Sequence, residues 1–593
     1  MRKSGWALLW KGSACALALG AAQTGWASEA DAGAAVAADS SANDDARAAS
    51  SGDDIIVTAR RREERLQDVP LAISVLGGAQ LEQQGVGDLA DLGAKVPGLV
   101  VANSLGGGRS TPTFAIRGQS QQELAGIADP SVTLYVNDIA VPRPHGSNIS
   151  FFDIGSIEVA KGPQGTLFGR NTTGGAILVR TQRPKDHFEG YVSQMVGNRG
   201  AFTTEAMINV PLGDVGAIRV AGQHLERDGY IHDVILDKDI NSVNEEGLRV
   251  SLDVQPLPGV KNQLTVGVAR ADNGGTGGIS YFSLNPLFAP GIAAQKTRDI
   301  YHTASGVPMF SNIRNLYVDN QTTIELGDHF SLKNVFGYRR VKVHQMEDLD
   351  GNADLLFPVE RRVRQHQISE ELQLQGSFDR FDFILGGYYF REKSDDQALT
   401  TGALSGTGQT DPGPIEPWTI LAYAPRYSNT WVKPTNTSYA VFFQGNYQFT
   451  DQLSLTAGIR QNWDKREVVT LNRAFIVAAN ALSCRFTLDE DNDPSTPETR
   501  PSLDNCVFNG KKNFSEITYN ISGQFQPRPG LLFYVAHRHG YRSGGFSARG
   551  NSQARLDATF SPELVDDFEL GLKADWNIDG VFLRTNIAAY TAK

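Results

Sequence analysis

The chain has 593 residues, 40% of them hydrophobic, so it is long enough for more than one folded domain. Its formal net charge of −11 argues against a nucleic-acid partner, because proteins that bind nucleic acids usually present a concentrated basic face. The sequence has no run of eighteen or more apolar residues, which excludes an ordinary transmembrane helix.

Residues 1–27 have the pattern of a secretory signal peptide. Arg2 precedes a hydrophobic stretch that is too short to span a bilayer, and Ala27 is a small residue at the expected cleavage point. The alternative is a short buried helix. The following residues, 28–54, lack aromatic side chains and periodicity, so we predict a disordered linker.

A short strand-favouring segment follows the linker. It consists of Ile55, Ile56, Val57, Thr58 and Ala59, and Ile, Val and Thr favour an extended backbone. The neighbouring sequence offers no partner strand. The segment is therefore predicted to pair with a strand of another protein, or alternatively to form the first strand of the next domain.

The rest of the chain divides into two zones. Residues 66–183 mix short strand patterns with helical patterns and glycine turns, which predicts a compact mixed α/β domain. From about residue 187, apolar and polar residues alternate; Tyr439, Val441 and Phe443, for example, are separated by single residues. This alternation predicts strands with one apolar and one polar face, as in a β-sandwich or a membrane β-barrel.

The connections between these strands favour the barrel. Seven tight turns alternate with long polar connections, apart from one short connection near 198–201. Short turns at one end and long loops at the other are typical of outer-membrane barrels. We predict about fifteen strands between 187 and 591. An odd number leaves a barrel unclosed, with unpaired backbone groups in lipid, so the sequence is predicted to be truncated at its C-terminus.

Two cysteines remain once the predicted signal peptide, which contains Cys15, is removed. Cys484 and Cys506 form an even pair in a secreted chain, and the sequence between them is polar and rich in proline. We predict a disulfide that closes an exposed loop. The aspartates within this loop depart from the calcium-loop pattern, so no metal site is predicted.

Several motifs occur together in a characteristic order. They are "IIVTA", "DVPLAISV", "IRG", "VNDI", "IEVAKGPQGTLFGRNTTGGAI", "YRSGGF" and "SPELVDDFELGLKADW". In these motifs the chain resembles the TonB-dependent receptors of Gram-negative outer membranes. Two features depart from the family: Lys161 stands where arginine is usual, and the final third of the barrel is missing. The resemblance implies a plug domain (66–183) in the lumen of a 22-stranded transmembrane antiparallel β-barrel, of which 187–593 supplies an incomplete part.

The resemblance also implies a function. Residues 55–59 would be the TonB box, which adds as a strand to TonB and its inner-membrane energising complex. The expected activity is energised uptake of a scarce ligand, most often a ferric siderophore; a glycan, haem, cobalamin or a passive porin-like channel are alternatives. Lipid and lipopolysaccharide would surround the barrel. No catalytic signature is present, so neither an enzyme nor a cofactor is expected.

The family motifs also suggest individual site residues. Arg117 and Lys161 are expected to anchor the plug to the barrel, with Glu569 as a carboxylate partner; the alternative is unpaired charge in a watery lumen. Tight turns are expected at the glycines of the plug motif, which are Gly162, Gly165, Gly169, Gly174 and Gly175.

Candidate ligand-binding residues lie in two expected loops. Arg109, Arg143 and His145 would bind an anionic ligand if they lie in apical plug loops, and would otherwise be solvated surface. Trp418 and Tyr423 would stack on a sugar or catecholate ring, and would otherwise be interfacial aromatic residues.

Overall fold

The structure is a computed structural model, and residues 54–593 form one compact unit. Among the described residues, no helix combines the length and the apolar character that crossing a membrane requires. The predicted signal peptide, the predicted linker, Trp418 and Tyr423 lie outside these residues. The structure describes residues 55–104, 107–121, 123–279, 289–305, 307–349, 351, 358–402, 426–476, 481–484, 502–547, 556–579 and 581–593.

The first part of this unit is a small mixed α/β domain. Its central sheet has the order β3 (Ile73–Gly77), β9 (Ile154–Lys161), β10 (Gly175–Thr181), β7 (Val132–Val136) and β8 (Ile139–Val141). The β10–β7 pair is parallel and the other neighbours are antiparallel. Almost every residue of β7 and of β10 is buried, which explains their continuous apolar runs.

Smaller elements complete this domain. A second sheet consists of β4 (Leu99–Ser104), β5 (Gly108–Ile116) and β6 (Gln119–Ser120). The helical elements are η2 (Leu66–Asp68), α2 (Gly78–Gln83) and α3 (Leu92–Lys95). The apolar core lies between these elements and the central sheet.

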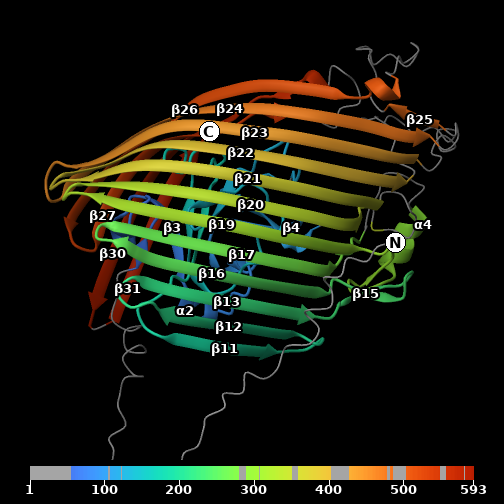
Figure 1. The fold of residues 1–593 in the computed structure, drawn as a ribbon, viewed down its shortest axis with the longest axis horizontal. Coiled ribbons are helices and arrows are strands. Elements are labelled where there is room, and N and C mark those ends of the chain that lie inside the picture. Colours follow the sequence, from blue (N-terminus) through green and yellow to red (C-terminus); the bar gives the residue numbers. More distant parts are fainter. Residues whose placement is uncertain are drawn as a thin grey trace, which may run out of the picture. The chain divides into compact units, whose positions relative to one another are not determined.

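The second part is one large antiparallel sheet of sixteen strands. Fifteen of them follow one another in chain order, and β25 pairs only with β24 (Figure 1). The prediction of about fifteen strands is therefore confirmed. The strands are β11 (Glu189–Val196), β12 (Phe202–Pro211), β13 (Gly216–Arg227), β16 (Val243–Leu257), β17 (Val260–Gly274), β19 (Phe310–Leu326), β20 (Phe330–Asp348), β21 (Pro358–Ser377), β22 (Phe381–Gly402), β23 (Arg426–Gln448), β24 (Leu453–Ile476), β25 (Ala481–Cys484), β26 (Phe508–Arg528), β27 (Leu531–Arg542), β30 (Glu563–Ile578) and β31 (Val581–Ala592).

Short elements lie in the long connections of this sheet, at the end opposite the tight turns. They are β14 (Ile231–Asp233), β15 (Lys238–Ile240), α4 (Ala289–Lys296), β18 (His302–Thr303), η6 (Leu503–Asn505), β28 (Gly545–Phe546) and β29 (Thr559–Phe560).

The two faces of the large sheet have opposite polarity. Val441 and Leu570 are 53% and 64% exposed on one face, whereas Gln444 and Glu569 are buried on the other. A soluble sandwich buries its apolar face, so the outward apolar side chains exclude that alternative and are typical of a membrane barrel. The polar inner face contacts the small domain, as the hydrogen bonds and ion pairs below demonstrate.

Candidate functional site: the contacts that hold the small domain

The segment predicted to pair with another protein is folded into the small domain. β1 (Ile56–Val57) pairs with β2 (Glu64–Arg65) in an antiparallel ladder. Val57 and Ala59 are buried in an apolar cluster that also contains side chains of β22 and β23. In this conformation the segment is thus the first strand of the domain, as the alternative interpretation expected.

Thr58 holds this segment in place through Glu158 of β9. The Thr58 backbone N–H donates to both carboxylate oxygens of Glu158 at 2.9 Å, and the hydroxyl donates to Oε1 at 2.8 Å. Arg180 of β10 donates to the Thr58 hydroxyl at 2.8 Å. Burial raises the pKa of Glu158, although the hydrogen bonds from Thr58 partly offset it. The backbone donor of Thr58 is therefore already occupied.

Asp138 links the Thr58–Glu158 contact, which we call the latch, to the large sheet. Its carboxylate lies 2.8 Å from Arg180 and from Arg61, and 3.4 Å from Lys333 of β20. Burial opposes ionisation of Asp138, but the three cations outweigh it and hold its pKa well below the usual range. Arg61 also lies 3.7 Å from Glu371 of β21. The segment around Thr58 is thus connected by buried charges to two strands of the large sheet.

Arg117 is the centre of a second buried charge cluster. It lies between β5 and β6, 3.1 Å from Asp567, and pairs with Glu569. Arg538 of β27 contacts the same two carboxylates at 3.3 and 2.9 Å. The ring of Tyr590 lies 3.8 Å from the Arg117 guanidinium carbon. The structure thus brings Arg117 and Glu569 together.

Lys161 contacts the large sheet through its backbone, whereas the family motif predicted a contact through its charged side chain. Within the described residues its ammonium has no ion pair, and burial together with the nearby Arg117 lowers its pKa. Its backbone carbonyl accepts a hydrogen bond from Arg538 at 3.3 Å. Arg538 of the large sheet therefore supplies the second cation of the cluster. The sequence motif gave no signal for Arg538, because that residue lies far away in the chain.

A third cluster is centred on Asp129, which the sequence did not single out. Its carboxylate contacts Arg143 at 3.0 Å and pairs with Arg170 and Arg466. Arg143 also lies 2.8 Å from Glu392 of β22. Burial opposes ionisation of Asp129, but the arginines hold its pKa well below the usual range.

The interpretation of Arg143 and His145 as exposed residues is wrong. Both are buried, and the Arg143 guanidinium is held by the carboxylates of Asp129 and Glu392 and by the backbone carbonyl of Ala128. Burial, together with Arg361 and Arg143, lowers the pKa of His145 to about 3, so its ring is neutral. Arg109 is half-buried and pairs with Asp88 at 2.6 Å. The large sheet encloses these Pro- and Gly-rich segments, which is why a loop-like sequence is not solvated here.

The plug-motif glycines have two different structural roles. Gly162 and Gly169 have φ angles of +83° and +82°, as tight turns require. At Gly165, a Cβ atom would lie 2.9 Å from the Thr518 Cβ of β26. Gly174 and Gly175 are likewise packed closely against neighbouring atoms. Close approach, as well as turn formation, therefore explains these glycines.

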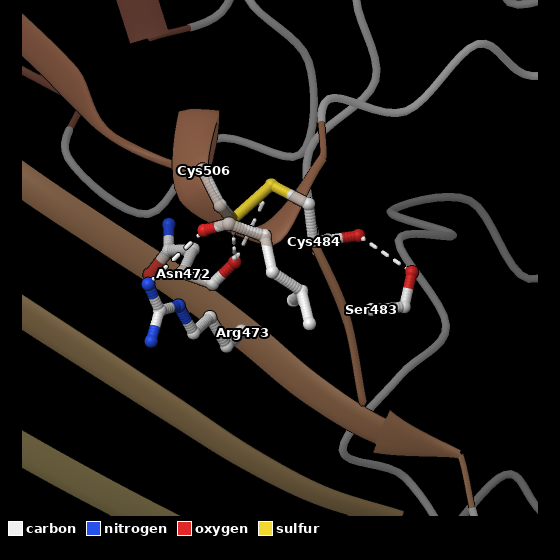
Figure 2. The surroundings of a disulfide bond; sticks show 6 residues. Asn472, Arg473, Ser483, Cys484 and Cys506 are labelled. Atoms are coloured by element: carbon white, nitrogen blue, oxygen red, sulfur yellow. Dashed lines mark hydrogen bonds between the residues drawn. A yellow bond between two sulfur atoms is a disulfide. The ribbon is translucent and has the colours of Figure 1, made fainter. Parts of the chain in front are cut away.

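The predicted disulfide is present. Cys484 at the end of β25 and Cys506 after η6 are joined at 2.12 Å, beside Asn472 of β24 (Figure 2). Both cysteines are buried. The residues between 485 and 501 lie outside the described part of the chain.

Two family models match this chain. The TonB-dependent Receptor Plug Domain matches residues 65–176, and the TonB dependent receptor-like beta-barrel matches residues 254–592, more than half of the chain. The chain belongs to the TonB-dependent receptors. The small domain is accordingly the plug, and the large sheet is the barrel wall. The family consists of receptors and transporters, and membership places the chain in the outer membrane of a Gram-negative bacterium.

Several curated and solved proteins are similar to this receptor. The pesticin receptor of Yersinia enterocolitica is 32% identical over 142 residues, which are 24% of this chain and 20% of that protein. The catecholate siderophore receptor Fiu of Escherichia coli K12 is 23% identical over 549 residues, which are 86% of this chain and 67% of that protein. The matched part thus spans only about a fifth of the pesticin receptor.

A solved structure has the same fold. The ferric yersiniabactin uptake receptor FyuA from Yersinia pestis superposes with a TM-score of 0.69 at 16% identity. The match covers 88% of this chain and 72% of that chain.

Proposed function

We propose that this chain acts as a TonB-dependent receptor for the energised uptake of a ferric siderophore. The observation that supports this proposal is the latch between Thr58 and Glu158, which holds residues 55–59, the proposed TonB box, against the plug. The ligand class is supported by relatives named as receptors for a catecholate siderophore and for ferric yersiniabactin. Passive diffusion through a channel does not require a plug that is held in the lumen by buried ion pairs.

The mechanism couples ligand binding to release of this latch. A ferric chelate binds from outside, above the plug (66–183), and shifts it within the barrel (187–593). Thr58 then leaves Glu158, and its free backbone N–H becomes available for strand pairing with TonB. Force through that strand acts on the plug and opens a path. Lipid and lipopolysaccharide surround the exposed apolar face of the wall.

The segments outside the described residues have assigned roles in this proposal. Residues 1–27 direct export, and 28–54 form the N-terminal segment that precedes the TonB box, which residues 60–65 join to the plug. Trp418 and Tyr423 remain candidates for stacking on the ligand, whereas Arg143 and His145 are buried in this conformation and are not included in the proposed ligand contacts.

The variant Ile56→Pro tests the energised step. Ile56 is 49% exposed, so the substitution removes little packing but deletes a backbone N–H that strand pairing needs. Cells carrying the full gene product should bind ⁵⁵Fe-enterobactin at the surface normally but accumulate about tenfold less of it than cells with the wild-type protein. The control Ile56→Ala keeps the N–H and should accumulate iron normally.

Two outcomes would contradict the proposal in different ways. Undiminished accumulation in the proline variant would contradict TonB-energised transport. If the wild-type protein transports none of the ferric catecholate, hydroxamate and citrate complexes but does transport haem or cobalamin, the mechanism stands and the siderophore assignment is wrong.

A further inference from the structure

The disulfide belongs to a buried apolar cluster on the barrel wall. We call it the outer cluster, because it lies in and beside the long connections of the sheet. Its members come from β23, β24, β25, β26, β28 and the segments around them: Val432, Val468, Cys484, Cys506, Phe508, Phe546 and Leu556. Both sulfur-bearing side chains are at most 2% exposed. The disulfide therefore forms part of a packed core and is more than a clip between two loop ends.

The plug residue Ile127 packs against the outer cluster. Its neighbour Gly126 accepts a hydrogen bond through its carbonyl from Asn436 of β23 at 2.9 Å. On the other side, a Cβ atom at Gly545 would lie only 2.4 Å from the Ile127 carbonyl oxygen. Plug segment 125–129 is thus enclosed by the wall, with no room for even one additional methyl group at Gly545.

The same segment also carries Asp129, the centre of the arginine cluster. Arg542, at the end of β27, donates to the Asp129 carbonyl at 3.2 Å. Arg466 of β24 pairs with the Asp129 carboxylate. Apolar contacts at Ile127 and charged contacts at Asp129 therefore hold adjacent parts of one plug segment against β24 and β27.

We propose that the Cys484–Cys506 disulfide shapes a seat for plug segment 125–129 and thereby keeps the plug closed in the barrel. β25 pairs with the end of β24, and Cys506 lies two residues before β26 (Figure 2). The covalent bond holds β25 and Cys506, which both belong to the connection between β24 and β26, close together, so the outer cluster against which Ile127 packs stays assembled. Without the bond these two parts of the connection separate, and Ile127 loses the outer cluster as a packing surface while the Asp129 ion pairs remain.

A leak assay tests this seat without TonB or a siderophore, so its result is independent of the proposed uptake function. Iron-replete cells expressing the full gene product are exposed to vancomycin, which an intact outer membrane excludes. Cys484→Ala/Cys506→Ala and Ile127→Ala should each increase sensitivity by about threefold or more, because each removes the same contact. The triple variant should be no more sensitive than the more sensitive of the two.

A matched control and a second readout separate seating from misfolding. Val100→Ala truncates a plug valine that is 62% exposed, and it should leave sensitivity unchanged. Hydrogen exchange of the purified receptors should be faster across residues 123–131 in the disulfide-free variant, but unchanged across β9. If the disulfide-free variant does not assemble, Ile127→Ala in the disulfide-bonded protein still decides the question.

The results that overturn the proposal are definite. An Ile127→Ala receptor that assembles and shows no increase in vancomycin sensitivity rules out the seat. Additive effects of the disulfide and Ile127 substitutions, or unchanged exchange across 123–131 without the disulfide, show that the disulfide stabilises only its own loop.

Discussion

Arg117→Ala is expected to loosen the plug at its boundary with the wall. The change leaves Asp567 and Glu569 with one fewer cation in a site where both are buried. Removing one partner of a buried ion pair costs about 3–5 kcal/mol, and the lower end applies because Arg538 remains in contact with both carboxylates. Trypsin protection of the plug should be lost at a clearly lower guanidinium concentration than in the wild-type protein.

Two further variants sharpen this prediction. Arg117→Lys should lose trypsin protection at an intermediate guanidinium concentration, because one ammonium cannot make the two separate contacts of the guanidinium. Arg183→Ala is the matched control, since Arg183 is an exposed arginine of the plug. It should change the guanidinium concentration at which protection is lost only a little.

A double-mutant cycle decides whether the pair acts as a unit. Arg117→Ala and Glu569→Gln should together reduce the stability of the plug by less than the sum of their separate effects, because the second substitution removes a charge that has lost one of its cations in the first. Strict additivity would mean that the two side chains do not depend on each other.

Glu158→Ala is expected to free residues 55–59, the proposed TonB box, in the absence of any ligand. The substitution removes the acceptor of the Thr58 backbone and hydroxyl donors. A hydrogen bond to a charged group contributes about 1.5–3 kcal/mol, so losing this set should raise the population of the released segment about tenfold or more. Trypsin should cut faster at Arg60, Arg61 and Arg62, and the purified periplasmic domain of TonB should bind about tenfold more tightly.

The neighbouring chain offers a matched control for this prediction. Glu63 is an exposed glutamate close to the same segment, and Glu63→Ala should change neither trypsin cleavage nor TonB binding. Glu158→Gln keeps one acceptor oxygen, so its trypsin cleavage rate and its TonB affinity should lie between those of Glu63→Ala and Glu158→Ala. If Glu158→Ala leaves both measurements at the wild-type value, Glu158 does not hold the box.

Local sequence patterns predicted the strands of the wall correctly. The alternation around Val441 and Leu570 assigned apolar residues to one face, and those residues are exposed on the outside of the sheet. Alternation has a period of two residues, so it depends only on the strand itself. The order of short and long connections then distinguished a barrel from a sandwich, because it depends only on the sequence between neighbouring strands.

The burial of Arg143 and His145, and the charge clusters around Asp129 and Asp138, could not be predicted in this way. Arg143 and His145 follow the sequence pattern of a surface loop, and their burial became visible only in the folded chain. The partner of Arg143 on the wall is Glu392, 249 residues away in the sequence, and no local pattern indicates which strand of the wall will face it. Asp129 and Asp138 were missed for the same reason.

The sequence by itself determined the strand pattern, the disulfide partners and the family motifs, because each depends on residue types at fixed spacings. Only the tertiary structure decided that Thr58 is held by Glu158, 100 residues further along the chain, and that Ile127 packs against the cluster around the disulfide. These contacts join distant segments inside the barrel. Their existence depends on how the plug is enclosed, which is a property of the whole fold.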